Sequence, residues 1–136
     1  IDLCLSINAD GMHVGGTDKS VAEVRAIIGP DKILGSSCYG DLALAHAAQA
    51  AGASYVAFGG FYPSKVKKYP VTTAPTIVSD WKAQGKVPSC VIGGMNKENS
   101  APLVANGADM VAAISSVYLA GDPQAAARAF VNLFPT

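Results

Sequence analysis

Hydrophobic residues gather in five short, nearly unbroken runs along the chain instead of alternating with polar residues. The runs cover residues 11–14, 32–36, 54–58, 89–92 and 110–114. Unbroken apolar runs of this length are typical of strands that are buried on both faces, as they are in a parallel sheet. The pattern therefore predicts five strands of a parallel sheet.

Helical patterns with recognisable ends separate these runs. Ser20 and Glu23 form a capping box before one helix, which Gly29-Pro30 ends. The packing face of this helix is predicted to comprise Val21, Val24, Ile27 and Ile28. Further helices are predicted at residues 41–51 before Gly52, at 76–84, at 99–106 and from Asp122-Pro123 onward, and a helix-like segment at 2–7. Strands that alternate with helices are parallel strands joined by helical crossovers.

Two architectures share this alternation, a doubly wound open sheet and a (β/α)8 barrel. A doubly wound sheet that binds nucleotides carries a GxGxxG fingerprint after an early strand, and this sequence has none. We therefore expect an α/β fold of the (β/α)8 TIM-barrel type. Residues 1–136 are predicted to be a single domain that supplies about five of the eight β-α units of such a barrel.

Composition narrows the class of protein further. Half of the residues are hydrophobic and only 15% are charged, which is enough apolar surface for an ordered core. The charges of the 10 basic and 10 acidic residues cancel, so the chain has no net positive charge that would attract nucleic acid or an anionic membrane. No apolar run is long enough to cross a membrane. Cys4, Cys38 and Cys90 lie far apart, which favours a reduced, cytoplasmic protein.

The residues that follow the predicted strands are rich in glycine, serine and lysine. They are Gly15-Gly16-Thr17-Asp18, residues 36–39, residues 59–68, residues 93–96 and Ser115-Ser116. Ligands bind beyond the C-terminal ends of parallel strands, where glycine permits close approach of the backbone and lysine supplies charge to phosphate. The sequence therefore predicts a phosphate-binding edge, with Asp18 as a carboxylate for Mg²⁺.

In order and spacing, these segments resemble the thiamine phosphate synthase family over essentially the whole chain. The matching residues are Ala9–Gly15 with Asp18, Leu34-Gly35-Ser36-Ser37, Tyr55–Gly59 with Tyr62-Pro63-Ser64 and Lys67, Ile92-Gly93-Gly94-Met95, and Ile114-Ser115. The resemblance implies a Mg²⁺-dependent transferase of thiamine biosynthesis. Such an enzyme couples 4-amino-2-methyl-5-(hydroxymethyl)pyrimidine diphosphate with 4-methyl-5-(2-phosphooxyethyl)thiazole and releases pyrophosphate.

The resemblance also implies roles for individual residues. Asp18 is similar to a Mg²⁺ ligand of the family, and Ser37 and Lys67 resemble catalytic contacts to the diphosphate. The remaining residues that the resemblance assigns to substrate binding, chiefly around the thiazole phosphate, are Ser64, Gly93, Gly94, Ile114 and Ser115. The chain departs from the family pattern at Gly16 (usually glutamine), Tyr39 (often histidine) and Val66 (usually a hydroxyl residue).

By the same resemblance the five predicted strands are strands 4–8 of the barrel. Strands 1–3, which carry a second acidic Mg²⁺ ligand in the family, then lie upstream of Ile1. A sheet with two unpaired edges exposes apolar surface, so we expect the chain to need its missing N-terminal barrel half, or a second chain, to fold.

Two other functions remain open at the level of the sequence. A related thiazole tautomerase shares the barrel, but it uses a histidine where this chain has Tyr39, and a phenol is a poorer proton shuttle near neutral pH. A phosphate-binding pseudoenzyme would keep the glycines and lose catalysis. His13 and His46 receive no functional role, Cys38 is expected to be an unreactive thiol, and Trp81 is expected to pack a helix.

Overall fold

The computed structural model describes residues 1–63, 70 and 72–136, and its centre is a five-stranded parallel sheet in the order β1-β2-β3-β4-β5. The strands are β1 Gly11–Val14, β2 Ile33–Tyr39, β3 Tyr55–Phe58, β4 Ser89–Ile92 and β5 Met110–Ala112. Each strand from β2 onward pairs with the one that precedes it in the chain, which is the order that repeated β-α units give in a barrel. The predicted α/β class and parallel sheet are confirmed.

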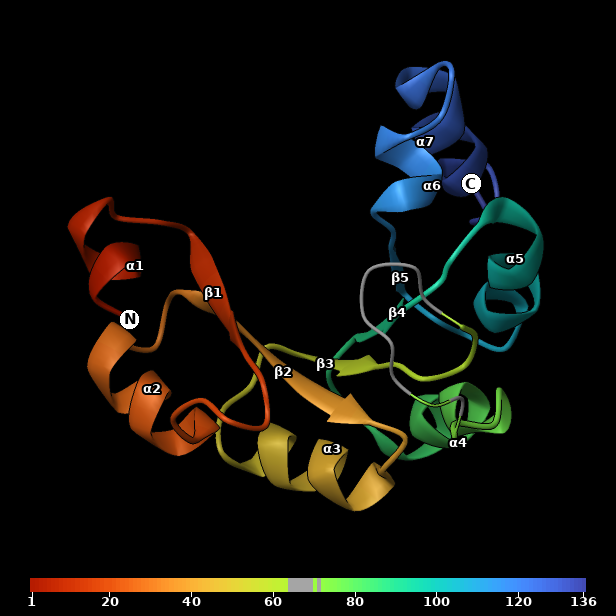
Figure 1. The fold of residues 1–136 in the computed structure, drawn as a ribbon. Coiled ribbons are helices and arrows are strands. Elements are labelled where there is room, and N and C mark those ends of the chain that lie inside the picture. Colours follow the sequence, from red (N-terminus) through yellow and green to blue (C-terminus); the bar gives the residue numbers. More distant parts are fainter. Residues whose placement is uncertain (64–69, 71) are drawn as a thin grey trace.

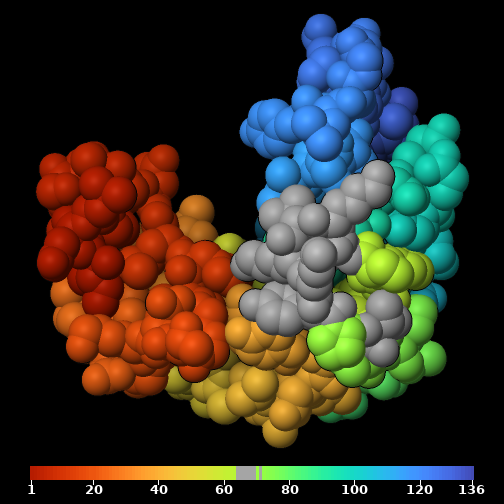
Figure 2. Space-filling view, in the orientation of Figure 1, coloured from red at the N-terminus to blue at the C-terminus, as the bar shows by residue number. Residues whose placement is uncertain are grey.

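Helices connect the strands and cover the outer side of the sheet. They are α1 Asp2–Ser6, α2 Val21–Ile28, α3 Leu42–Ala50, α4 Thr76–Gln84, α5 Lys97–Ala105, α6 Ser115–Tyr118 and α7 Pro123–Val131. Figure 1 shows the sheet as a curved arc, with α2 to α5 along its outside and its two ends far apart. The inner side of the arc carries no helix among the described residues. Figure 2 shows the opening between the N-terminal end of the arc, with α1, and its C-terminal end, with α6 and α7.

Local sequence explains where several helices begin. The Ser20 side chain accepts a hydrogen bond from the Glu23 amide at 3.2 Å, and the Glu23 carboxylate accepts one from the Ser20 amide at 3.0 Å. These two bonds confirm the predicted capping box. Asp41 and Asp122 cap α3 and α7 as simple N-caps, because their side chains accept amide protons of the first helical turn.

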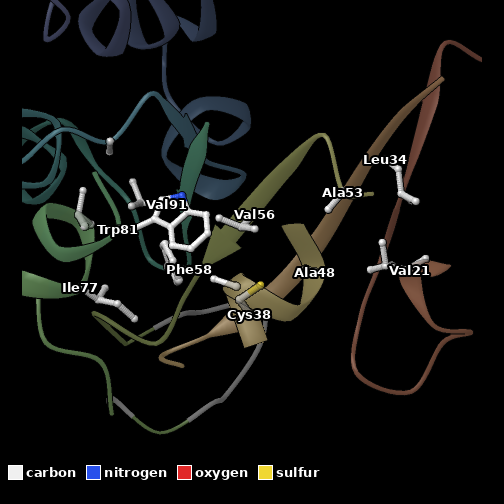
Figure 3. Close-up of a cluster of buried hydrophobic side chains, with 14 of the residues drawn as sticks. Val21, Leu34, Cys38, Ala48, Ala53, Val56, Phe58, Ile77, Trp81 and Val91 are labelled. Carbon is white, nitrogen blue, oxygen red and sulfur yellow. The ribbon is translucent and has the colours of Figure 1, made fainter. Parts of the chain in front are cut away.

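The hydrophobic core lies between the sheet and these helices. Figure 3 shows Trp81 of α4 against Phe58 and Val56 of β3 and Val91 of β4. The Trp81 ring meets the Phe58 ring edge-on with centroids 6.1 Å apart, and its indole N–H donates to the Val87 carbonyl at 3.0 Å. Trp81 is only 2% exposed, so its predicted role in helix packing is confirmed.

Strand β2 is longer than the sequence predicts. It continues to Tyr39, so Ser37 lies inside the strand instead of after it. The extension is held by pairing of Ser37 with Ala57 and by the Gly59 amide, which donates to the Tyr39 carbonyl at 3.1 Å. The register shifts between Ser37 and Tyr39, and Tyr39 adopts a φ of 54°. Pairing with β3 therefore keeps polar residues in an extended strand.

Other details of the helices and strands also differ from the predictions. Helix α5 begins at Lys97 instead of residue 99, since Asn96 and Asn99 form a reciprocal cap with two bonds of 2.8 Å. Strand β5 ends at Ala112, two residues early, and α6 begins at Ser115, where no helix was predicted. Ile27 is 49% exposed and so does not belong to the packing face of α2.

Both ends of the sheet leave apolar side chains uncovered. The large apolar residues that are exposed near the two ends are Leu3, Leu5, Ile7, Tyr118, Leu119 and Val131. They lie on α1 or just after it at one end, and on α6 and α7 or beside them at the other.

No helix in the described part of the chain is both long and apolar enough to cross a bilayer.

Candidate functional site

The C-terminal ends of the five strands meet at one edge of the sheet, because all neighbouring strands are parallel. The described connections that leave this edge are residues 15–20, 40–41, 59–63, 93–96 and 113–114. The structure thus gathers at this edge the segments that were predicted to bind phosphate, apart from the part of the long loop that lies outside the described residues.

The loop after β1 is a tight turn that holds the Asp18 carboxylate. Asp18 Oδ2 accepts the Gly15 amide proton at 2.7 Å, and the Asp18 amide donates to the Gly15 carbonyl at 3.2 Å. The Gly16 amide donates to the Tyr39 hydroxyl at 3.0 Å, which ties this turn to the end of β2. The Asp18 side chain is exposed, so the turn fixes one carboxylate oxygen and presents the group at the edge.

This arrangement fits a Mg²⁺ ion that takes only one ligand from this part of the protein. Mg²⁺ is commonly held by one or two carboxylates together with water and substrate phosphate oxygens. Among the described residues, no three His, Cys, Asp or Glu side chains gather closely enough to enclose a metal. An ion held by Asp18 would therefore take its other ligands from elsewhere, such as water and the oxygens of a diphosphate.

Ser37 belongs to a hydrogen-bonded chain of three side chains from neighbouring strands. The Nε2 atom of His13 on β1 lies 2.8 Å from Ser37 Oγ, and its Nδ1 atom lies 2.9 Å from the Tyr55 hydroxyl on β3. Sequence reasoning gave no role to His13. The sequence carried no signal for these contacts, because only the strand register shows that His13 of β1, Gly35 of β2 and Tyr55 of β3 lie side by side.

The segments that follow β3, β4 and β5, which include the first turns of α5 and α6, are joined to one another on the other half of the edge. The Tyr62 hydroxyl donates to the Asn99 carbonyl at 3.0 Å, and the Ser116 hydroxyl donates to the Met95 carbonyl at 2.6 Å. Gly94, which has a φ of 65°, lies against the Pro63 carbonyl oxygen. This contact brings two of the loops close without an intervening side chain.

Gly94 is therefore expected to tolerate no side chain. A Cβ atom at this position would overlap the Pro63 carbonyl oxygen, and the positive φ already disfavours an L residue. We expect Gly94→Ala to lower the free energy of unfolding by roughly 1–3 kcal/mol, measured by denaturant unfolding. Gly121→Ala is the matched control, since a Cβ there meets no atom of the described residues within 4 Å. Equal stability of the two variants would contradict this interpretation.

The predicted site residues thus fall into two groups on one edge. Asp18 and Ser37 lie on the side of β1 and β2. Gly93 and Gly94 follow β4, while Ile114 is the N-cap and Ser115 the first residue of α6. Ser64 and Lys67, together with Val66, lie outside the described residues.

The buried cysteines do not contribute a nucleophile to this edge. Cys38 and Cys90 are 1% and 8% exposed, and all three cysteines are free. Burial raises the pKa of the Cys38 thiol from 9.0 to about 11 and has the same effect on Cys90. Both thiols are thus protonated at neutral pH, which agrees with the expectation that Cys38 is unreactive.

These raised pKa values predict a loss of stability in alkali. Between pH 9 and 11 the unfolded chain releases these two protons while the folded chain keeps them, so stability falls as pH rises. Each thiol is expected to contribute a slope of roughly 1 kcal/mol per pH unit to the free energy of unfolding. Denaturant unfolding across this range measures the slope. The variant Cys38→Ala/Cys90→Ala should lose the part of the slope that the two thiols contribute, and an unchanged slope would contradict the assignment.

Comparison with known proteins gives one consistent family. The sequence model described as thiamine monophosphate synthase matches residues 1–117. A thiamine-phosphate synthase of Janthinobacterium sp. (strain Marseille) is 95% identical over 134 residues, which cover 98% of this chain and 65% of that protein. A thiamine-phosphate synthase of Thioalkalivibrio sulfidiphilus is 42% identical and is covered over 64% of its length.

A solved structure agrees with this result. The thiamine phosphate pyrophosphorylase of Pyrococcus furiosus superposes with a TM-score of 0.82 at 29% identity. The alignment covers 97% of this chain and 62% of that one. The chain therefore spans a little less than two thirds of the length of each of these three relatives.

Proposed function

The chain belongs to the thiamine monophosphate synthase family, and on this premise we propose that it carries the catalytic edge of a thiamine phosphate synthase. The proposed enzyme joins 4-amino-2-methyl-5-(hydroxymethyl)pyrimidine diphosphate to 4-methyl-5-(2-phosphooxyethyl)thiazole. The products are thiamine phosphate and pyrophosphate. The observation that carries the proposal is the convergence of Asp18, Ser37 and the glycine loop after β4 at one edge of the sheet.

The five strands are proposed to be strands 4–8 of an eight-stranded barrel. Their consecutive parallel order supports this, since a barrel needs each strand beside its predecessor. Strands β1 and β5 are the edges of the described sheet, and an apolar groove beside β5 is lined by Val111, Ala113 and Phe130. Further strands and a helix would cover these surfaces, and the relatives are long enough to supply them.

The proposed reaction is a substitution at the pyrimidine methylene carbon. The bond from this carbon to a diphosphate oxygen breaks, and its electron pair leaves with the oxygen, which gives a pyrimidine cation. The lone pair of the thiazole nitrogen then forms the new C–N bond. No other reactant is required, so the task of the protein is to stabilise the departing negative charge and to align the two rings.

Each half of the edge serves one substrate in this proposal. Ser37 donates a hydrogen bond to the diphosphate, and Asp18 would hold the Mg²⁺ ion that neutralises diphosphate charge when it is bound. Lys67 adds a cation to the same group. The proposed contacts to the thiazole phosphate are Ser64, Gly93, Gly94, Ile114 and Ser115. Gly93 supports this placement because, among the described residues, a Cβ there would meet only the Gly60 amide nitrogen, at 3.8 Å, so a ligand can approach the backbone.

Tautomerase activity is a weaker proposal for this edge. It needs a proton shuttle near neutral pH, and the Tyr39 hydroxyl instead accepts the Gly16 amide proton at 3.0 Å. This bond commits the phenol to holding the Asp18 turn.

We also propose a cytoplasmic location, which the three free cysteines support.

A substrate assay on the intact protein separates these functions. The synthase proposal predicts that pyrophosphate and thiamine phosphate form in equal amounts only when the pyrimidine diphosphate, the thiazole phosphate and Mg²⁺ are all present. Isomerisation of a thiazole carboxylate without coupling would indicate a tautomerase. Binding of both substrates without turnover would indicate a pseudoenzyme. Either of these last two results would overturn the proposal.

A further inference from the structure

We propose that Tyr55 and His13 form a relay that holds Ser37 as a hydrogen-bond donor toward the anionic substrate. Tyr55 and His13 are positioning residues in this relay, and Ser37 is the group that touches substrate. The inference deepens the proposed function, since it rests on the diphosphate lying against Ser37. It adds two residues and a direction of hydrogen bonding to that site.

The relay is built from three adjacent strands. Gly35 of β2 pairs in register with His13 of β1 and with Tyr55 of β3, so the two larger residues flank it. Ser37 follows two positions later on β2 and therefore projects from the same face of the sheet as Gly35. This geometry lets the imidazole of His13 contact the Tyr55 hydroxyl at 2.9 Å and Ser37 Oγ at 2.8 Å.

Gly35 is what makes the contact between β1 and β3 possible. A Cβ atom on Gly35 would overlap the Tyr55 ring and hydroxyl and would lie only 2.5 Å from His13 Nδ1. The absence of a side chain on the middle strand thus opens a slot through which Tyr55 crosses β2. The rings of Tyr55 and His13 lie 5.6 Å apart between centroids and are tilted by 33°.

The chemistry of the phenol sets the direction of the relay. Burial raises the pKa of Tyr55, so its hydroxyl keeps its proton at neutral pH. A neutral imidazole has one donor and one acceptor nitrogen. In the contact between the Tyr55 hydroxyl and His13 Nδ1, the phenol O–H is a better donor than the imidazole N–H. When Tyr55 donates to Nδ1, the proton of the imidazole resides on Nε2, which then donates to Ser37 Oγ.

Ser37 is thereby fixed in a single role. Its oxygen accepts from His13, so its own hydroxyl proton is free to point to a second partner. An anionic diphosphate oxygen is the partner that such a donor prefers, and the bond strengthens as negative charge develops on the leaving group. A carboxylate in place of Tyr55 would reverse the relay, since it would accept from Nδ1–H and leave Nε2 to accept the serine proton.

The tautomer of His13 tests the relay without any substrate. We propose ¹⁵N NMR of the imidazole in the intact, ligand-free protein, at a pH where the spectrum shows neutral rings. The Nε2–H form is expected to dominate, and Tyr55→Phe should shift the population at least threefold toward Nδ1–H. A dominant Nδ1–H form in the unsubstituted protein, or no shift in Tyr55→Phe, would overturn the proposal. His46, whose Nε2 lies 3.1 Å from Gln84 Oε1, is an internal reference.

A double-mutant cycle tests the consequence for the reaction. Tyr55→Phe is expected to lower kcat for coupling about tenfold with little change in KM, because the ordered donor matters most as charge develops. In a Ser37→Ala background the same change should have no further effect. Tyr118→Phe, with a side chain that is 76% exposed on α6, is the matched control.

The possible outcomes of this cycle are distinct. Equal effects of Tyr55→Phe with and without Ser37 would show that Tyr55 acts through general packing and would overturn the relay. If the intact protein showed no coupling at all while His13 carried its proton on Nε2 as expected, the synthase proposal would fall and the directed hydrogen bonds would stand.

Discussion

Ser37→Ala is expected to lower kcat for thiamine phosphate formation by roughly 100-fold, which is the effect of removing one donor from a site of developing negative charge. Ser37 lies within β2 at the C-terminal edge, half-buried and bonded to His13 at 2.8 Å. The alanine variant keeps the strand and loses only the hydroxyl. Steady-state release of pyrophosphate by the intact protein measures the change.

The KM value for the pyrimidine diphosphate distinguishes the cause of this loss. A bond that forms mainly as charge develops on the leaving group lowers kcat and leaves KM within about threefold. The matched control is Ser79→Ala, which removes an exposed hydroxyl that donates to the Thr76 carbonyl on α4. If Ser37→Ala and Ser79→Ala retained the same kcat, Ser37 would have no part in the reaction.

Asp18→Asn is expected to raise the Mg²⁺ concentration that gives half-maximal activity by about 10–100-fold. The asparagine can still accept the Gly15 amide proton, which Asp18 Oδ2 accepts at 2.7 Å, so the turn is retained. It loses the negative charge, and a hard cation such as Mg²⁺ binds a neutral amide oxygen less strongly than a carboxylate. Direct titration with Mn²⁺ in the presence of pyrophosphate gives a second measure that does not depend on turnover.

A matched substitution at the opposite edge of the sheet controls for charge alone. Asp31 is exposed just before β2, on the N-terminal side of the strands. Asp31→Asn removes the same charge and is expected to leave the metal requirement unchanged. Equal Mg²⁺ dependence in the Asp18 and Asp31 variants would exclude Asp18 as a ligand.

The fold was predictable where a residue's own neighbours determine its structure. Apolar runs located all five strands, and Ser20, Asp41 and Asp122 marked helix starts because their side chains bond to amides within three residues. The start of α5 was nevertheless misplaced, although the nearby residues Asn96 and Asn99 set it. Other predictions failed where distant contacts decide. Ser37 is in a strand because β3 pairs with it, and Ile27 is exposed because the helix turns that position toward solvent.

The same division applies to the site. Glycines and Asp18 after apolar runs could be recognised from sequence order, since the C-terminal ends of parallel strands converge whatever the details of packing. The contacts of His13 with Ser37 and Tyr55 join residues that are 24 and 42 positions apart. They depend on strand register and on the missing side chain of Gly35, and neither could be predicted from spacing along the chain.

Amide hydrogen exchange of the intact protein tests most directly whether both anionic substrates bind along this one edge. With pyrophosphate and Mg²⁺, exchange should slow in peptides that cover residues 15–18 and 36–39. With the thiazole phosphate, exchange should slow at residues 93–95 and 114–116. Peptides at the N-terminal edge, residues 29–33 and 85–88, should not change. Slowed exchange at those N-terminal peptides, with none at the opposite edge, would contradict the account.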